Sequence, residues 1–257
     1  MRFLLQYAAC AAVALAAAVP AQAASVLQSS TAFSNVQLDV RDLTPDDGVQ
    51  ANYAILPTSY TSLTSLATDG QMPHQDGTAV GLGQAGSASL TVGQASTWVR
   101  TDGTLGSLET FASFPGPTEG GHLYSTGNQY FRVMLDAHSE LWLTGDYAIS
   151  VERQGDELGT QSGGASIWAQ LFADGKFVDE QASLTVLQGE AGGQRSGHFN
   201  LGFANDSDVA TTVYLSMNSS TSIFGNPPLP PVPEPQTYAM FGAGLLLLAA
   251  RRKFARK

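Results

Sequence analysis

The chain of 257 residues has only one cysteine, Cys10, which lies in an apolar N-terminal segment. Once that segment is removed, the protein has no disulfide, no thiol nucleophile and no thiolate metal ligand. A domain of this composition must rely on hydrophobic burial and β-ladder hydrogen bonds for its stability.

Basic residues are also scarce in the body of the chain. Between Ala24 and Pro233 there are 21 acidic residues and only six basic ones, which are Arg41, Arg100, Arg132, Arg153, Lys176 and Arg195. Phosphate backbones would be repelled by such a surface, so a nucleic-acid partner is not expected. The near absence of lysine disfavours exposed helices, and 27 glycines suit strands joined by turns.

The N-terminal segment has the order of a secretory signal peptide. Arg2 precedes an apolar run from Phe3 to Val19, and the small residues Ala21 and Ala23 provide a signal-peptidase site. We therefore expect residues 1–23 to be a signal peptide recognised by the secretion machinery and signal peptidase. A core helix is the alternative, although the run has no polar face.

The body alternates apolar and polar residues with the period of a β-strand. The inward sets are Phe131, Val133 and Leu135; Leu141, Leu143, Ile149 and Val151; Phe199, Leu201 and Phe203; and Val213, Leu215 and Met217. About ten short strands without a persuasive helix predict one all-β domain at residues 24–224, an antiparallel β-sandwich of jelly-roll type. A Gly-Asp break at Gly145 suggests a bulge.

Glycine and proline indicate where this domain turns. Turns are expected at the Asp-Gly pairs 47–48, 69–70, 76–77, 102–103 and 174–175, and a long loop at residues 110–127. Residues 81–86 spell G-x-G-x-x-G. They lead into a strand-like run rather than a helix, so a flexible turn is expected and not a dinucleotide site.

The C-terminal segment has three parts. Residues 225–235 form a proline-rich linker, residues 237–250 carry no charge, and Arg251 and Arg252 begin a basic end. A helix over residues 237–250 spans about 21 Å, which is short for a bilayer core of about 30 Å. The basic side chains can snorkel and act as a cytoplasmic stop, so residues 236–257 are predicted to be a transmembrane helix and basic tail.

This tail resembles the PEP-CTERM sorting signal of exported bacterial proteins. The resemblance implies that an exosortase, a membrane-embedded cysteine transpeptidase-like enzyme, recognises Pro233, Glu234 and Pro235 together with Arg251 and Arg252. These are substrate residues, not catalytic ones. It also implies an intermediate anchored in the inner membrane, then release to the cell surface or an exopolysaccharide matrix. Residues 36–55, 139–152 and 196–217 are loosely similar to body segments of such proteins.

Chemistry-bearing motifs are sparse in the body. Asp42, Asp46 and Asp47 could form half of a calcium site or could simply be turn residues. The four histidines (His74, His122, His138 and His198) have no metal-binding spacing, and neither a G-x-S-x-G motif nor any other catalytic set is evident. No cofactor is expected. A sugar-binding face or ordinary packing could account for Trp98, Trp142, Trp168, Tyr130, Tyr147 and Tyr214.

The leading hypothesis is a non-enzymatic exported β-sandwich with a structural or adhesive role in a biofilm matrix. The alternative is a lectin-like or carbohydrate-active jelly roll acting on exopolysaccharide, and a calcium-stabilised adhesin is a third possibility.

Overall fold

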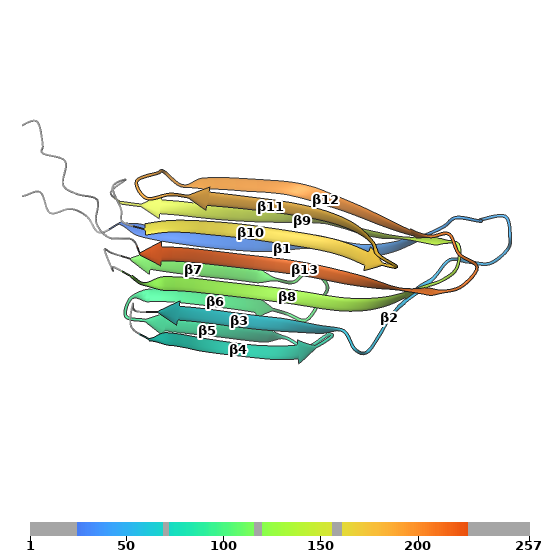
Figure 1. The fold of residues 1–257 in the computed structure, drawn as a ribbon, viewed down its shortest axis with the longest axis horizontal. Coiled ribbons are helices and arrows are strands. Elements are labelled where there is room, and N and C mark those ends of the chain that lie inside the picture. The colour runs from blue at the N-terminus through green and yellow to red at the C-terminus, as the bar shows by residue number, and fades with distance from the viewer. Residues whose placement is uncertain (1–24, 69–71, 116–119, 156–160, 226–257) are drawn as a thin grey trace, which may run out of the picture. The chain divides into compact units, whose positions relative to one another are not determined.

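The computed structural model describes residues 25–68, 72–115, 120–155 and 161–225. The chain divides into two units, Met1–Pro227 and Pro228–Lys257, and every described residue belongs to the first. The described residues form thirteen strands and no helix, arranged as two antiparallel sheets (Figure 1). The prediction of an all-β antiparallel sandwich is confirmed.

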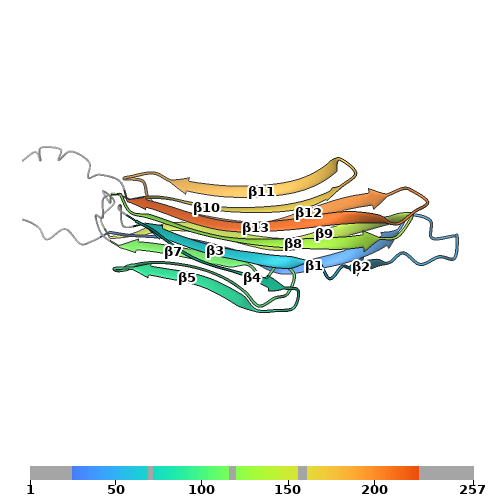
Figure 2. The same cartoon turned by 60° about the horizontal axis from the view of Figure 1, so that its bottom comes forward.

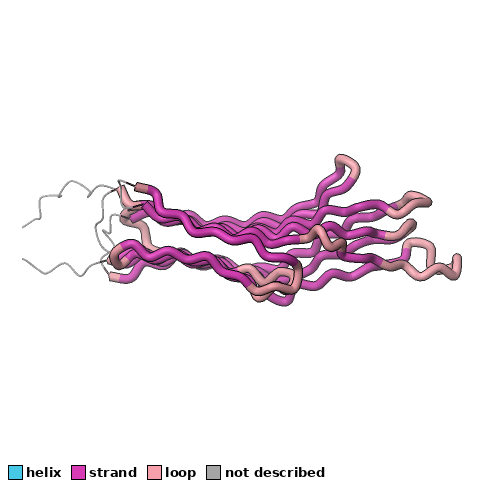
Figure 3. Tube along the Cα trace, turned by 90° about the horizontal axis from the view of Figure 1, so that it is seen from below, coloured by secondary structure: helices cyan, strands magenta, loops and turns pink. Residues whose placement is uncertain are grey.

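The two sheets form two layers (Figures 2 and 3). Sheet A has the order β12 (Gly193–Asn205), β9 (Ser139–Gln154), β1 (Val26–Asp42), β7 (Glu109–Pro115), β6 (Ala95–Thr101) and β5 (Gly86–Val92). Sheet B has the order β11 (Lys176–Val186), β10 (Gln161–Ala173), β13 (Thr211–Gly225), β8 (His122–Leu135), β3 (Tyr60–Thr68) and β4 (Pro73–Gly81), and β2 (Tyr53–Ile55) also pairs with β8.

Strict alternation places the core between the two sheets. The inward sets predicted for β8, β9, β12 and β13 are all buried. Leu141 and Leu143 are fully buried from sheet A, and Val133 and Leu135 from sheet B. Because burying one such side chain contributes about 1.5–3 kcal/mol, these rows specify which face of each strand points inward.

A bulge in β1 switches the inward face of that strand. Residues with odd numbers from Leu27 to Phe33 point inward, but Val36, Leu38 and Val40 do so beyond the register shift between Ser34 and Gln37. The bulge predicted at Gly145 is therefore wrong, because β9 is continuous and its partner carries the irregularity. Gly145 serves packing instead, since a Cβ there would lie 2.6 Å from Phe199.

Other local predictions were also wrong. Residues 110–127 are not one long loop, because Glu109–Pro115 is β7 and β8 begins at His122. Asp76 and Gly77 lie inside the edge strand β4 rather than at a turn. The strands are more numerous than ten and often long, with 17 residues in β1. The local glycines and prolines favoured turns and loops in these segments, whereas pairing with neighbouring strands made them part of β4, β7 and β8.

Buried hydroxyl groups join the two sheets. Thr31 of β1 is hydrogen bonded to Thr110 of β7 at 2.7 Å and to Ser219 of β13. Ser29 donates to the carbonyl oxygen of Gly164 at 2.7 Å. Since buried polar groups are costly when unpaired, these bonds favour one alignment of sheet A on sheet B.

Candidate functional site

The predicted processing residues lie outside the described residues. These are Ala21 and Ala23 of the signal-peptidase site, and Pro233, Glu234, Pro235, Arg251 and Arg252 of the sorting tail. Within the described ranges no helix qualifies as a membrane span, and the helix predicted at residues 237–250 is outside them.

The aspartates proposed for calcium lie just after β1. Asp42 accepts a hydrogen bond from the Thr44 N–H at 2.8 Å. Asp47 accepts from the Val49 N–H at 2.7 Å and the Thr44 hydroxyl at 2.8 Å, and these bonds hold the pKa of Asp47 below its usual value. Asp46 is exposed. The bonds made by Asp42 and Asp47 agree with the interpretation of these residues as turn formers.

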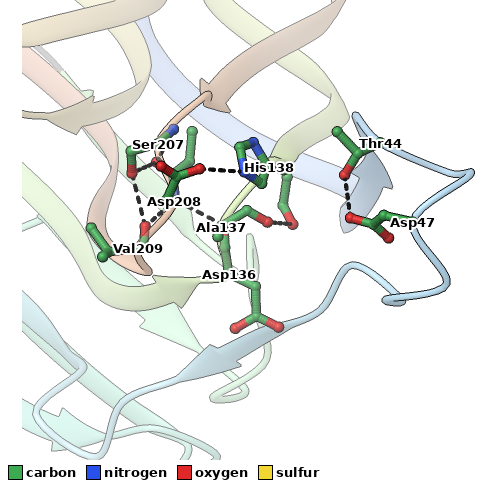
Figure 4. A network of polar contacts seen from close by, with 10 residues as sticks. Thr44, Asp47, Asp136, Ala137, His138, Ser207, Asp208 and Val209 are labelled. Carbon is green, nitrogen blue, oxygen red and sulfur yellow. Dashed lines mark hydrogen bonds and ion pairs between the residues drawn. The ribbon is translucent and has the colours of Figure 1, made fainter.

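A second set of polar contacts lies at the same end of the sandwich (Figure 4). His138 Nε2 is 2.9 Å from Asp208, while the carboxylate of Asp136 points away from that pair. Asp42, Asp47, Asp136 and His138 line a depression of about 350 Å³. Nevertheless, in the part of the chain that the structure describes, no three His, Cys, Asp or Glu side chains are arranged to hold a metal ion.

The other described histidines lie on separate strands, with His74 on β4, His122 on β8 and His198 on β12. His198 lies on the outer face of β12, 3.0 Å from Asp146. Asn35 at the β1 bulge donates to the same carboxylate at 2.7 Å, and the two contacts lower the pKa of Asp146, with the bond from Asn35 contributing most. These bonds fasten the bulge to β9 and β12 and form no catalytic set.

A concave surface lies on the outer face of sheet A. We call it the sheet A groove; its volume is about 550 Å³. Small outward residues of the two central strands form its floor: Ser30 pairs with Ser150, and Ala32 with Ala148. Because the neighbouring strands carry larger side chains, the small floor residues leave a trough.

Two aromatic rings form one wall of the groove. Trp98 of β6 and Phe111 of β7 are cross-strand partners, and their rings stack with centroids 5.6 Å apart and an interplanar angle of 20°. The Arg100 guanidinium lies 4.8 Å from the Trp98 ring centroid and donates from Nε to Glu109 at 2.7 Å. The wall therefore combines an apolar plane with an ion pair.

Amide and hydroxyl groups form the opposite wall. Gln194 and Ser196 of β12 pair with Ser150 and Ala148 of the floor. Glu152, beside the groove, accepts hydrogen bonds from Gln194 and, at 3.0 Å, from Ser150. The row from Gln194 to Trp98 crosses five strands, or about 19 Å at the usual strand spacing. This surface can hold an extended molecule that has both apolar faces and hydroxyl groups.

A buried amide from sheet B positions the aromatic wall. Gln129 of β8 is fully buried. It accepts a hydrogen bond from the Gly106 N–H at 2.7 Å and donates to the Thr104 carbonyl at 2.9 Å. Both residues belong to the connection between β6 and β7, so Gln129 fixes the hairpin that presents Trp98 and Phe111.

The remaining aromatic candidates are dispersed. Tyr147 is buried in the core, in agreement with the interpretation that it serves ordinary packing. Trp142 lies on the outer face of sheet A, where its ring would meet a Cβ on Gly202 at 3.1 Å. Trp168, Tyr130 and Tyr214 lie on the outer face of sheet B. Of the six, only Trp98 lines the sheet A groove.

Sequence reasoning missed Phe111 and the floor. Phe111 lies within the segment expected to be a loop, and serines and alanines carry no signal of their own. The residues 81–86, in contrast, do form a turn between β4 and β5, as predicted. Only the register of β9, β1, β7 and β6 brings the floor residues beside the rings.

Comparison with known proteins found one similarity, at the sorting tail. No curated protein and no solved structure matches the chain. Residues 231–253 match the model of the family described as PEP-CTERM protein-sorting motif, which confirms the resemblance. The match implies an exported protein with a membrane-anchored intermediate and processing by an exosortase-type enzyme. The chain thus carries, at residues 231–253, the sorting motif of PEP-CTERM proteins.

Proposed function

We propose that this protein is a non-enzymatic adhesive component of the cell surface or extracellular matrix, and that it binds neutral polysaccharide in the sheet A groove. The observation that carries the proposal is the stacked pair Trp98–Phe111 beside a trough floored by small serine and alanine residues. Pyranose rings present apolar C–H faces and a rim of hydroxyls, which suits an aromatic plane flanked by hydrogen-bonding groups.

The lining favours binding over turnover. Glycoside hydrolysis usually requires two carboxyl groups flanking the bond. Of the described residues that line the groove, Glu109 is the one acid, and it is paired with Arg100. Glu152, beside the groove, is held by hydrogen bonds from Gln194 and Ser150. The adhesive role and the lectin-like alternative therefore merge into one proposal, in which attachment is carbohydrate binding.

Charge favours a neutral polysaccharide. The chain has a formal net charge of −10, and a polyanionic glycan would be repelled by it at long range. The export implied by the tail brings the groove into a compartment where polysaccharide is available.

The test uses the exported protein and the double variant Trp98→Ala with Phe111→Ala. Affinity electrophoresis in gels containing neutral exopolysaccharide of the producing bacterium should show at least about tenfold weaker binding, since each lost ring contact contributes about 0.5–1.5 kcal/mol beyond area burial. Trp142→Ala, on the same face outside the groove, is the matched control and should bind normally. Circular dichroism checks that the variants fold.

Unchanged binding by the folded double variant would refute the assignment of the groove. New reducing ends released from the polysaccharide by the wild-type protein would instead make it an enzyme and refute the non-enzymatic role.

A further inference from the structure

The outer face of sheet B carries a row of exposed aromatic side chains. We call it the aromatic band; its members are Phe177 of β11, Phe172 of β10, Tyr214 of β13, Tyr130 of β8 and Tyr60 of β3. Their exposed fractions run from 39% for Tyr130 to 62% for Phe177. Five successive strands thus each contribute one ring to a surface that faces solvent.

The register of sheet B arranges these rings in two neighbouring groups. Phe172 pairs with Phe177 on one side and with Tyr214 on the other, and Tyr130 pairs with Tyr60. Ring centroids are 6.2 Å apart for Phe172–Tyr214 and 5.1 Å apart for Tyr60–Tyr130.

Arg132 lies on β8 between the group that ends at Tyr214 and the pair Tyr130–Tyr60. It is the cross-strand partner of Tyr214, and its guanidinium lies 5.6 Å from the Tyr214 ring centroid. It also donates to the Thr58 hydroxyl at 3.3 Å. Its Nε is buried and has no hydrogen-bond partner among the described residues, so the guanidinium is only partly engaged by groups of this protein.

Neutral hydrogen-bonding groups adjoin the band on the same face. Asn218 donates to Asn128 at 2.6 Å and to Thr126 at 3.0 Å. These outward residues are followed across the sheet by further hydroxyls at Ser62, Thr64, Ser166 and Ser220. The face is therefore a set of rings bordered by hydroxyl and amide groups.

The chemistry of this face indicates its partner. A contiguous group of exposed rings is typical of an interaction surface. The charged neighbours, Arg132 and Asp179, have opposite signs, so the face offers no net charge to a nucleic acid or an anionic lipid headgroup. Rings beside neutral hydroxyls fit the apolar faces and hydroxyl rim of an uncharged polysaccharide.

We propose that the aromatic band is a second polysaccharide-binding surface and that the protein cross-links two polysaccharide chains. The outer faces of two packed sheets point in opposite directions, so the groove and the band engage different chains or different parts of one chain. The cross-linking role rests on the proposed function of the groove, whereas binding by the band does not. Two sites on one molecule also raise avidity for a polymer with many repeats.

The test of the band uses the exported protein and two double variants, Tyr60→Ser with Tyr130→Ser and Phe172→Ser with Tyr214→Ser. Co-sedimentation with insoluble cellulose, chitin and curdlan measures binding, and soluble alginate serves as an acidic competitor. Each double variant should show about tenfold weaker binding to at least one neutral polymer, and alginate should not compete. Phe224→Ser is the matched control, because Phe224 is 45% exposed, as Tyr214 is, and lies on the same face outside the band.

Cross-linking is measured as the rise in viscosity and turbidity when the protein is added to soluble neutral exopolysaccharide. The wild-type protein should produce the rise. The groove variant and each band variant should still bind but should lose it, because each retains only one site.

The outcomes separate the two proposals. Band variants that sediment and cross-link like the wild type would overturn the inference and leave the groove unaffected. Groove variants that cross-link normally would refute the groove while the band stands. Band variants that instead lose a dimer seen by light scattering, or lose binding to phosphatidylcholine vesicles, would assign the band to a second copy or a membrane and overturn the inference.

Discussion

The two outer faces of this sandwich differ although the same alternation produces both. At the groove in sheet A the outward residues of β1 and β9 are small, and larger side chains on either side leave a trough. In sheet B five neighbouring strands each place an aromatic ring outward, and the rings form a band. The difference shows that the size of cross-strand neighbours, more than the number of aromatics, decides whether a sheet face becomes concave.

The faces also differ in what holds them. The aromatic wall of the groove is borne by a hairpin whose connection is fastened from the other sheet by Gln129. The rings of the band lie within long ladders of sheet B and need no such anchor. Substitutions in the core should therefore weaken binding at the groove more than binding at the band.

The largest effect is expected from Gln129→Leu. The substitution leaves the Gly106 N–H and the Thr104 carbonyl without their partner, and an unpaired buried group costs about 1–3 kcal/mol. We expect a loss of about 2–4 kcal/mol in the free energy of unfolding, measured by denaturant titration. Polysaccharide binding by the groove should weaken, while sedimentation through the band persists.

The control for this change is Gln28→Leu, which faces outward on β1 and should alter stability by less than about 0.5 kcal/mol. Equal losses for Gln28→Leu and Gln129→Leu would contradict the anchoring role of Gln129.

A smaller effect is expected from Gly145→Ala. A Cβ at this position would lie 2.6 Å from the Phe199 ring and 2.9 Å from Val36 at the β1 bulge. Overpacking of this kind costs about 1–3 kcal/mol, and thermal unfolding should show it. Gly164→Ala in sheet B is the control, because the atom nearest to a Cβ there would be the side-chain hydroxyl oxygen of Ser222, at 3.3 Å. If Gly164→Ala is as harmful as Gly145→Ala, close packing does not explain Gly145.

The smallest effect concerns pH and the outer face of sheet B. The His122 ring stacks on Phe224 with centroids 4.2 Å apart, and burial lowers the pKa of His122 below its usual value of 6.5. The unfolded chain then binds the proton more readily. The contribution of the neutral His122 ring to the free energy of unfolding is therefore fully present above pH 6.5. It is lost as the pH falls from 6.5 toward the lowered pKa of the folded state.

His122→Phe should remove this part of the pH dependence. Melting temperatures measured between pH 7.5 and pH 5 should fall less steeply for the variant than for the wild-type protein. Parallel pH profiles would mean that the folded environment does not disfavour the protonated ring.

Local patterns predicted strands where apolar residues repeat strongly. The rows through Leu141 and Leu143 and through Phe199 and Leu201 have large side chains at every second position, and both are buried as expected. β3 and β4 escaped prediction, because β3 buries Thr61 and Ser65 beside its apolar residues and β4 is an exposed edge strand. β7 was hidden by the prolines and glycines that follow it.

The candidate surfaces were less accessible to prediction than the strands. Trp98 could be named as a sugar-stacking candidate from its residue type, but Phe111 is its partner only because β6 and β7 pair in one register. The same holds for the band, where Phe172 and Tyr214 are distant in sequence and adjacent in space.

Residue order alone was enough to predict the fold class, the inward face of the strands with the clearest alternation and the sorting motif at residues 231–253. These depend on residue order within one segment, that is, on a period of two or on a short contiguous motif. The tertiary structure decided the bulge in β1, the anchoring by Gln129 and the shapes of both outer faces. Those features depend on which strands become neighbours and in what register, and both are settled by packing the two sheets together.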